Sequence, residues 1–191
     1  MWNLPNKITL SRVALIPIFM IILLAPMDWG EIGFIEISIP LTHFIAGIIF
    51  IVASCTDWLD GYYARKLKLV TDFGKFVDPL ADKLLVTAAL IALVELGFAP
   101  AWMVIVILAR EFAVSGLRQI AAANGDVIAA SKIAKWKTTT QIVAVAALLL
   151  HNILFAAIGF PFAYLCLWLA VIMTILSGWD YFVKNKHVVL K

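Results

Sequence analysis

The sequence has little charge and almost no cysteine. Of its 191 residues, 14% are Asp, Glu, Lys or Arg, whereas a soluble domain carries about 25% charged residues. The hydrophobic residues make up 64% of the chain, which is more than one small soluble domain can hide from water. This composition excludes a disordered chain and argues against a water-soluble enzyme. The two cysteines, Cys55 and Cys166, are too few for a disulfide framework or a CxxC metal site.

The sequence also lacks a signal-peptide cleavage site of the A-x-A type. Lys7 and Arg12 lie before the apolar run 13–27, as they would in a secretory signal. However, Pro26 follows Ala25 near the end of that run, and several more apolar segments come after it. We therefore interpret the run as a retained first membrane helix.

The apolar segments predict six membrane-spanning helices. A helix needs about 20 residues to cross the hydrocarbon core of a bilayer. Segment 37–56 is uncharged, and segment 138–179 is uncharged over a length that fits two spans, with break signals near its middle. The six predicted spans are 8–27, 39–60, 77–97, 100–121, 133–151 and 160–180.

Two of these spans are interrupted by ionisable residues. The uncharged run 84–94 is too short to cross a membrane alone, and the turn signal at 97–100 fixes its end. The third span therefore carries Asp78, Asp82 and Lys83 to membrane depth. In the fourth span the uncharged run 101–109 is also too short to cross a membrane. This span therefore continues through Arg110, Glu111 and Arg118. Because ionisable residues at membrane depth usually face a cavity, a polar site inside the bundle is expected.

All 15 Lys and Arg residues fall on one side of this arrangement. By the positive-inside rule that side is cytoplasmic, and both termini lie there. The charged residues of the opposite connections are all acidic, namely Asp28, Glu31, Glu36 and Glu95. We therefore expect an all-α, polytopic integral membrane protein, with residues 1–191 as one domain and a cytoplasm-facing polar cavity.

Four aspartates form two pairs within this region. Asp57 and Asp60 are three residues apart, and Asp78 and Asp82 are four apart, so each pair shares a helix face. Four carboxylates at close range require compensating charge, which could come from Arg65, Lys75 and Lys83. Divalent cations would compensate better, and an all-oxygen site suits Mg²⁺ or Mn²⁺ rather than Zn²⁺. A set of helix-packing ion pairs is the simpler alternative, and two same-face pairs disfavour it.

Such a site is suited to phosphate chemistry. Two carboxylate-bound ions can clamp a pyrophosphate and stabilise a leaving oxygen. The small residues Gly61, Ala64 and Gly74 let a ligand approach the backbone closely.

These residues fill every fixed position of the signature D-x2-D-G-x2-A-R-x8-G-x3-D-x3-D. The matching positions are Asp57, Asp60, Gly61, Ala64, Arg65, Gly74, Asp78 and Asp82. On this motif the chain resembles the CDP-alcohol phosphatidyltransferase family. The signature covers 26 residues, and the six-span layout extends the resemblance over the chain.

The resemblance implies an enzyme that binds two divalent cations, Mg²⁺ or Mn²⁺, and transfers a phosphatidyl group from CDP-diacylglycerol to an alcohol, releasing CMP. It implies metal ligation by Asp57, Asp60, Asp78 and Asp82, the last also acting as general base. It implies a CDP-binding surface made by Gly61, Ala64, Arg65 and Gly74. Homodimers are common in the family, although the sequence reveals no dimer face. No nucleic-acid partner is expected.

The acceptor alcohol is indicated by a different set of residues. Several cations on the fourth and fifth spans are expected beside the metal site, where Arg forks and Lys charges would bind an acceptor phosphate. They are Arg110, Arg118, Lys135 and Lys137. The alternative is that they are juxtamembrane charges. Span length favours the pocket for Arg110 and Arg118, whereas Lys137 fits both interpretations and Glu111 could partly neutralise Arg110.

Together with segments 3–6 and 9–12, these elements resemble the family branch that uses sn-glycerol 3-phosphate. One departure is Ala134, where that branch is expected to have Gly before Lys135. The predicted reaction gives phosphatidylglycerol phosphate and CMP in phospholipid biosynthesis, at the plasma membrane of a bacterium. Alternative acceptors are inositol phosphate, or phosphatidylglycerol for cardiolipin. A cation transporter is a more distant alternative, disfavoured by the apolar outer halves of the spans.

Overall fold

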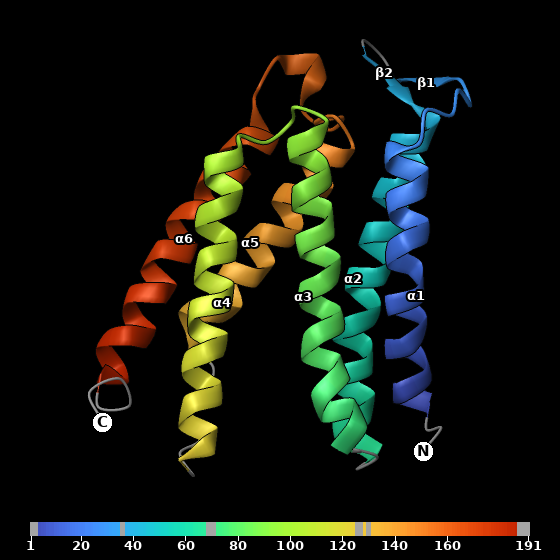
Figure 1. Cartoon of the computed structure of the whole chain (residues 1–191). Coiled ribbons are helices and arrows are strands. Elements are labelled where there is room, and N and C mark those ends of the chain that lie inside the picture. The colour runs from blue at the N-terminus through green and yellow to red at the C-terminus, as the bar shows by residue number, and fades with distance from the viewer. Residues whose placement is uncertain (1–3, 35–36, 68–71, 125–127, 129–130, 187–191) are drawn as a thin grey trace.

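The computed structural model describes residues 4–34, 37–67, 72–124, 128 and 131–186, without the side chains of 4–8, 34, 57–67, 72–80, 82, 123 and 132. Within these ranges the chain is mostly helical (Figure 1). The main helices are α1 (Leu4–Leu24), α2 (Leu41–Leu67), α3 (Asp72–Glu95), α4 (Ala101–Ala123), α5 (Lys132–Leu149) and α6 (Phe162–Lys184). Each overlaps one of the six predicted spans, so the predicted helical class is confirmed.

The connection between α1 and α2 departs from a purely helical fold. Strands β1 (Glu31–Phe34) and β2 (Ile37–Pro40) pair there as an antiparallel hairpin. This hairpin was not predicted, because four-residue strands are too short to produce a clear alternation of polar and apolar residues. A short 3₁₀ helix, η1 (Ala156–Ile158), was also not predicted and lies between α5 and α6.

The helix ends follow the turn signals of the sequence. Gly97 adopts a positive φ of 75° between α3 and α4, a conformation that glycine adopts without steric cost. Ser131 caps α5, because its side chain accepts a hydrogen bond of 3.2 Å from the backbone N–H of Ala134. Between α5 and α6, His151 and Asn152 both have positive φ, so the break predicted there is confirmed.

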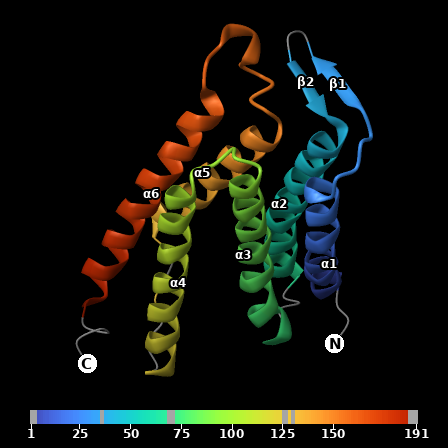
Figure 2. The same cartoon turned by 45° about the horizontal axis from the view of Figure 1, so that its top comes forward.

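Helices α1 to α4 run roughly along one axis, and α5 and α6 are inclined to them (Figure 1). The helices divide into two groups. Helix α1 packs against α2 and α3, and α6 packs against α5 and α4. Helix α5 also contacts α2 and α3 and therefore joins the groups. Both termini lie at one end of the bundle, which we call the terminal end, and β1 and β2 project at the opposite, hairpin end (Figures 1 and 2).

Among the side chains that the structure describes, the main buried cluster occupies the middle and the hairpin half of the bundle. Its fully buried side chains come from both groups and include Phe19, Phe50, Leu93, Met103 and Leu149. Helix α2 approaches the end of α5 closely at Gly47, where an added Cβ would lie 2.8 Å from Cδ2 of Leu150. Small residues at such crossings are typical of membrane helix packing.

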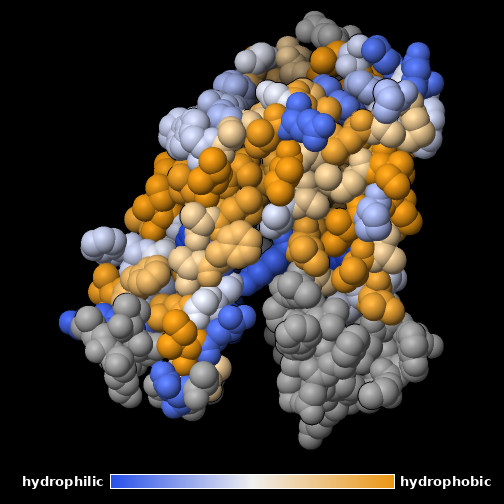
Figure 3. Space-filling model, viewed as in Figure 1, coloured by the Kyte–Doolittle hydropathy of each residue, from blue (hydrophilic) through white to orange (hydrophobic). Residues whose placement is uncertain are grey.

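One described helix, α6, is both long and apolar enough to cross a membrane, and shorter apolar helical stretches cover Thr9–Leu24 and Leu41–Thr56. Large apolar side chains are nevertheless exposed on several helices, among them Ile21, Val52, Ile105, Phe112 and Ile175. Figure 3 shows hydrophobic side chains in a broad band around the middle of the visible face.

Candidate active site

The four motif aspartates lie on two consecutive helices toward the terminal end. Asp57 and Asp60 lie in the second half of α2, and Asp78 and Asp82 lie in the first half of α3. Both pairs fall in continuous α-helix, which is the condition for each pair to share a face. The positions of their side chains are outside the described residues, as are those of Gly61, Ala64, Arg65 and Gly74.

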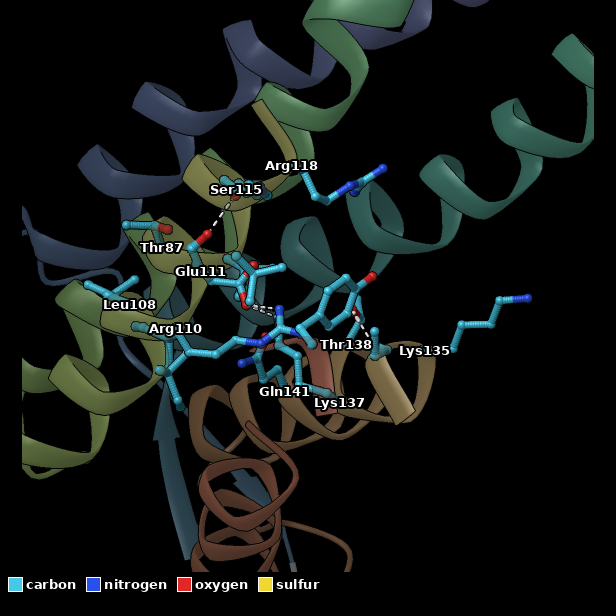
Figure 4. Close-up of a pocket in the computed structure, with 17 residues that line it drawn as sticks. Thr87, Leu108, Arg110, Glu111, Ser115, Arg118, Lys135, Lys137, Thr138 and Gln141 are labelled. Atoms are coloured by element: carbon cyan, nitrogen blue, oxygen red, sulfur yellow. Dashed lines mark hydrogen bonds and ion pairs between the residues drawn. The ribbon is translucent and has the colours of Figure 1, made fainter. Parts of the chain in front are cut away.

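A cavity of about 220 Å³, lined by both apolar and charged residues, lies between α3, α4, α5 and α6 (Figure 4). All four cations predicted to bind the acceptor line it, namely Arg110, Arg118, Lys135 and Lys137. The structure therefore brings together residues far apart in the sequence. Lys83, the residue after Asp82, also lines the cavity, so the cavity adjoins the helix that carries one aspartate pair.

The cavity opens where the two helix groups separate. Figure 3 shows a hollow at the terminal end, with hydrophilic side chains at its head. The cavity lining includes apolar residues from the bundle core, such as Leu90 and Ile107. The cavity is thus apolar toward the core and cationic toward the terminal end.

Glu111 occupies the interior of the cavity and binds two of the predicted cations. Its Oε1 accepts a hydrogen bond of 3.2 Å from Nη1 of Arg110, and it also forms an ion pair with Nζ of Lys137. The side chains of Arg110, Lys137 and Glu111 are only 11%, 5% and 16% exposed. The predicted pairing of Glu111 with Arg110 is confirmed, and the pairing with Lys137 is an addition to it.

The guanidinium group of Arg110 also bridges to α6. Its Nη2 donates a hydrogen bond to Oγ of Ser177, and its Cζ lies 5.4 Å from the centre of the Tyr181 ring. Sequence reasoning missed both α6 residues. A signal was available in the sequence, because Thr174, Ser177 and Tyr181 are spaced three and four residues apart and so share a helix face. The structure shows that all three are buried.

Arg118 and Lys135 differ from the two inner cations. Both side chains are exposed, and among the described residues no hydrogen bond or ion pair is made by either side chain. In Figure 4 both extend away from the cluster around Glu111. The four cations thus form two layers: a paired inner layer, Arg110 and Lys137, and an exposed outer layer, Arg118 and Lys135.

Lys83 joins α3 to α4 at the wall of the cavity. Its Nζ donates a hydrogen bond to Oγ of Ser115, and that hydroxyl donates in turn to the backbone carbonyl of Glu111 over 2.5 Å. The sequence suggests Lys83 as a counter-charge for the aspartates, and the structure adds this partner on α4. Ser115 therefore connects the residue next to Asp82 with the backbone of Glu111.

No group of three His, Cys, Asp or Glu side chains that could hold a metal ion is found within the described part of the chain. None of the four motif aspartates is among those described side chains. Their donor set still fits the predicted ions, because carboxylate oxygens are the ligands that Mg²⁺ and Mn²⁺ prefer.

Comparison with known proteins extends the match beyond the motif. Residues 2–176 match the model of the CDP-alcohol phosphatidyltransferase family. A Bacillus subtilis protein named CDP-diacylglycerol–glycerol-3-phosphate 3-phosphatidyltransferase is 65% identical over 97% of this chain and 96% of its own length. Proteins with the same name from Haemophilus influenzae and Rickettsia bellii are 40% and 38% identical, over 99% and 96% of this chain and 96% of their own lengths. The chain belongs to the CDP-alcohol phosphatidyltransferase family.

Proposed function

We propose that the protein transfers the phosphatidyl group of CDP-diacylglycerol to sn-glycerol 3-phosphate, giving phosphatidylglycerol phosphate and CMP. The observation that carries the acceptor assignment is the cavity in which Arg110, Arg118, Lys135 and Lys137 meet beside α3. A neutral alcohol would need no such set of cations, whereas a phosphate group would bind to them. The names of the relatives at 65%, 40% and 38% identity support the same acceptor.

The donor half of the site is assigned to the aspartate motif. Asp57, Asp60, Asp78 and Asp82 would hold two Mg²⁺ or Mn²⁺ ions. When bound, these ions supply positive charge that neutralises the pyrophosphate and the leaving phosphate of CMP. Asp82 also accepts the proton of the attacking hydroxyl of glycerol 3-phosphate as general base.

The remaining motif residues are assigned to the nucleotide. Gly61, Ala64 and Gly74 have no side chain or a single methyl group, so the backbone of α2 and α3 is open to the CDP group. Arg65 carries the positive charge of this surface and would bind its phosphates.

The acceptor half is assigned to the two layers of cations. Arg118 and Lys135 are exposed and available to an incoming phosphate. Arg110 and Lys137 are held deeper in the cavity by Glu111. We infer that the outer cations draw the phosphate into the cavity and that the inner cations bind it at the inner wall.

We further propose that the chain is one domain whose six helices cross the plasma membrane of a bacterium, with the terminal end in the cytoplasm. The exposed apolar side chains around the middle of the bundle support this placement. The positive-inside distribution of Lys and Arg sets the direction. Association into a homodimer stays a prediction.

The proposed function is tested with the purified protein, CDP-diacylglycerol and labelled glycerol 3-phosphate. We expect CMP release that requires both glycerol 3-phosphate and Mg²⁺ or Mn²⁺, together with labelled lipid product. Reactions with inositol phosphate, phosphatidylglycerol or no acceptor serve as controls. CMP release with one of these alternatives and none with glycerol 3-phosphate would overturn the acceptor assignment.

A further inference from the structure

The cavity contains one carboxylate among the described residues that line it, Glu111. Its other ionisable lining side chains are cationic, apart from the Tyr181 phenol, and the cations are Lys83, Arg110, Arg118, Lys135 and Lys137. An anion inside an anion-binding cavity weakens the field that attracts the ligand. The presence of Glu111 therefore requires an explanation beyond attraction of the acceptor.

The contacts of Glu111 indicate how it acts. One oxygen, Oε1, pairs with both Arg110 of α4 and Lys137 of α5. Arg110 is also bound to Ser177 and stacks over Tyr181, both on α6. Glu111 thus connects three of the four helices that form the cavity, and its own backbone carbonyl accepts from Ser115.

Burial strengthens the effect of this pairing. Arg110 and Lys137 are 11% and 5% exposed, and they converge on the same carboxylate oxygen. Loss of that carboxylate would remove one counter-charge from two like charges that lie close together in a poorly solvated place. The stronger repulsion between the two cations would then displace their side chains from the inner wall.

We propose that Glu111 is a positioning residue for the acceptor, which acts by holding the side chains of Arg110 and Lys137 in place at the inner wall of the cavity. This inference rests on the proposed function, because it assigns the affected ligand as the anionic acceptor. It predicts that loss of the Glu111 charge harms acceptor binding even though it makes the cavity more positive. Simple electrostatic attraction predicts the opposite sign.

The test is a steady-state comparison of wild type with Glu111→Gln, varying each substrate in turn. Because Gln keeps the size of the side chain and loses its charge, we expect the KM for glycerol 3-phosphate to rise about tenfold. The KM for CDP-diacylglycerol should stay within about twofold of wild type, since preorganisation is lost on the acceptor side only. The conservative Glu111→Asp should recover most of the acceptor affinity.

A double variant separates positioning from a general structural effect. If Glu111 acts through Lys137, adding Glu111→Gln to Lys137→Met should raise the KM for glycerol 3-phosphate by less than it does alone. Glu95→Gln removes the same charge from the exposed end of α3 and is the matched control; it should leave both KM values unchanged.

Several results would overturn the inference. They are an unchanged or lowered KM for glycerol 3-phosphate in Glu111→Gln, equal increases for both substrates, and additive effects in the double variant. If Glu111→Gln does not fold, a wild-type acceptor KM in Glu111→Asp keeps the proposal, and a KM raised equally for both substrates refutes it. Absence of any reaction with glycerol 3-phosphate in wild type would instead refute the proposed function.

Discussion

Individual side chains in the cavity differ in how much they are already engaged. Arg110 donates a hydrogen bond from one guanidinium nitrogen to Glu111 and from another to Ser177. Arg118 and Lys135 are exposed, and no interaction within the described residues engages their charged groups. Since a cation that is already paired has less to gain from a new anion, the two outer residues should contribute most to the first contact with phosphate.

Replacement of either outer cation by alanine tests this difference. We expect Arg118→Ala and Lys135→Ala each to raise the KM for glycerol 3-phosphate roughly tenfold, because each removes one charge-assisted hydrogen bond. The KM for CDP-diacylglycerol should change little. Lys186→Ala removes an exposed charge that does not line the cavity, and it should behave as wild type. Equal effects of all three variants would indicate a diffuse electrostatic effect instead.

The proposed base is tested by Asp82→Asn. This change keeps the shape of the side chain and removes its ability to accept a proton, so turnover should fall by a factor of about 10² or more. Metal-dependent CDP binding, followed by calorimetry, should remain measurable because three motif aspartates are intact. Retained turnover would exclude Asp82 as the base.

At the scale of helices and their connections, the sequence predicted where the helices lie better than it predicted the contacts between distant segments. Apolar runs and the signals at Gly97 and Asn152 located six helices, because these features act locally. The hairpin at 31–40 and the α6 contacts of Arg110 depend on pairing between distant segments, which a single sequence does not reveal. The short uncharged run in α3 did predict a polar site, since its length could be compared with membrane thickness.

Two helical glycines differ in the space around them, so their replacement by alanine should change stability in opposite directions. Gly47 lies where α2 packs closely against the end of α5, whereas Gly116 on α4 has open space beside it. Gly116→Ala meets no atom within 4 Å of the new methyl group and should stabilise α4 by about 0.5–1 kcal/mol. Gly47→Ala places its methyl group 2.8 Å from Leu150 and should destabilise by about 1–3 kcal/mol through overpacking. Thermal unfolding in detergent measures both. A higher Tm for Gly47→Ala would show that Leu150 moves aside freely.

Two histidines join α2 to the connection after α5. Nδ1 of His43 lies 2.8 Å from Nε2 of His151, and both rings pack against Phe98. His151 lies beyond the end of α5, and burial, followed by the charge of His43, lowers its pKa below 6.5. The hydrogen bond therefore links α2 to the connection that follows α5.

This pair predicts acid-sensitive stability. Because the pKa of His151 is lower in the folded than in the unfolded chain, the unfolded chain takes up the proton first as pH falls. Stability should therefore be full above pH 6.5, the ordinary value, and decrease below it. Thermal unfolding measured at pH values above and below 6.5 should show this decrease in stability in wild type and a smaller decrease in His151→Asn. The same decrease in both proteins would contradict the prediction.

At the scale of the whole molecule, the proposed orientation places the two ends of the bundle in different compartments. In a variant lacking Cys55 and Cys166, single cysteines introduced by Gly30→Cys and Lys186→Cys mark the hairpin and terminal ends. A membrane-impermeant maleimide should label position 30 only in right-side-out vesicles and position 186 only in inverted ones. Labelling of both positions from the same side would refute a topology with six crossings.

The depth of the aspartates along their helices has a further consequence. Asp57 comes sixteen residues after Leu41, the start of α2, which corresponds to about 24 Å of helix. Asp82 comes thirteen residues before Glu95, the end of α3, which corresponds to about 20 Å. In a hydrocarbon core of about 30 Å, these depths place the proposed reaction in the inner leaflet. The lipid donor would react without leaving that leaflet, and delivery of the product lipid to the outer leaflet would require a separate flipping step.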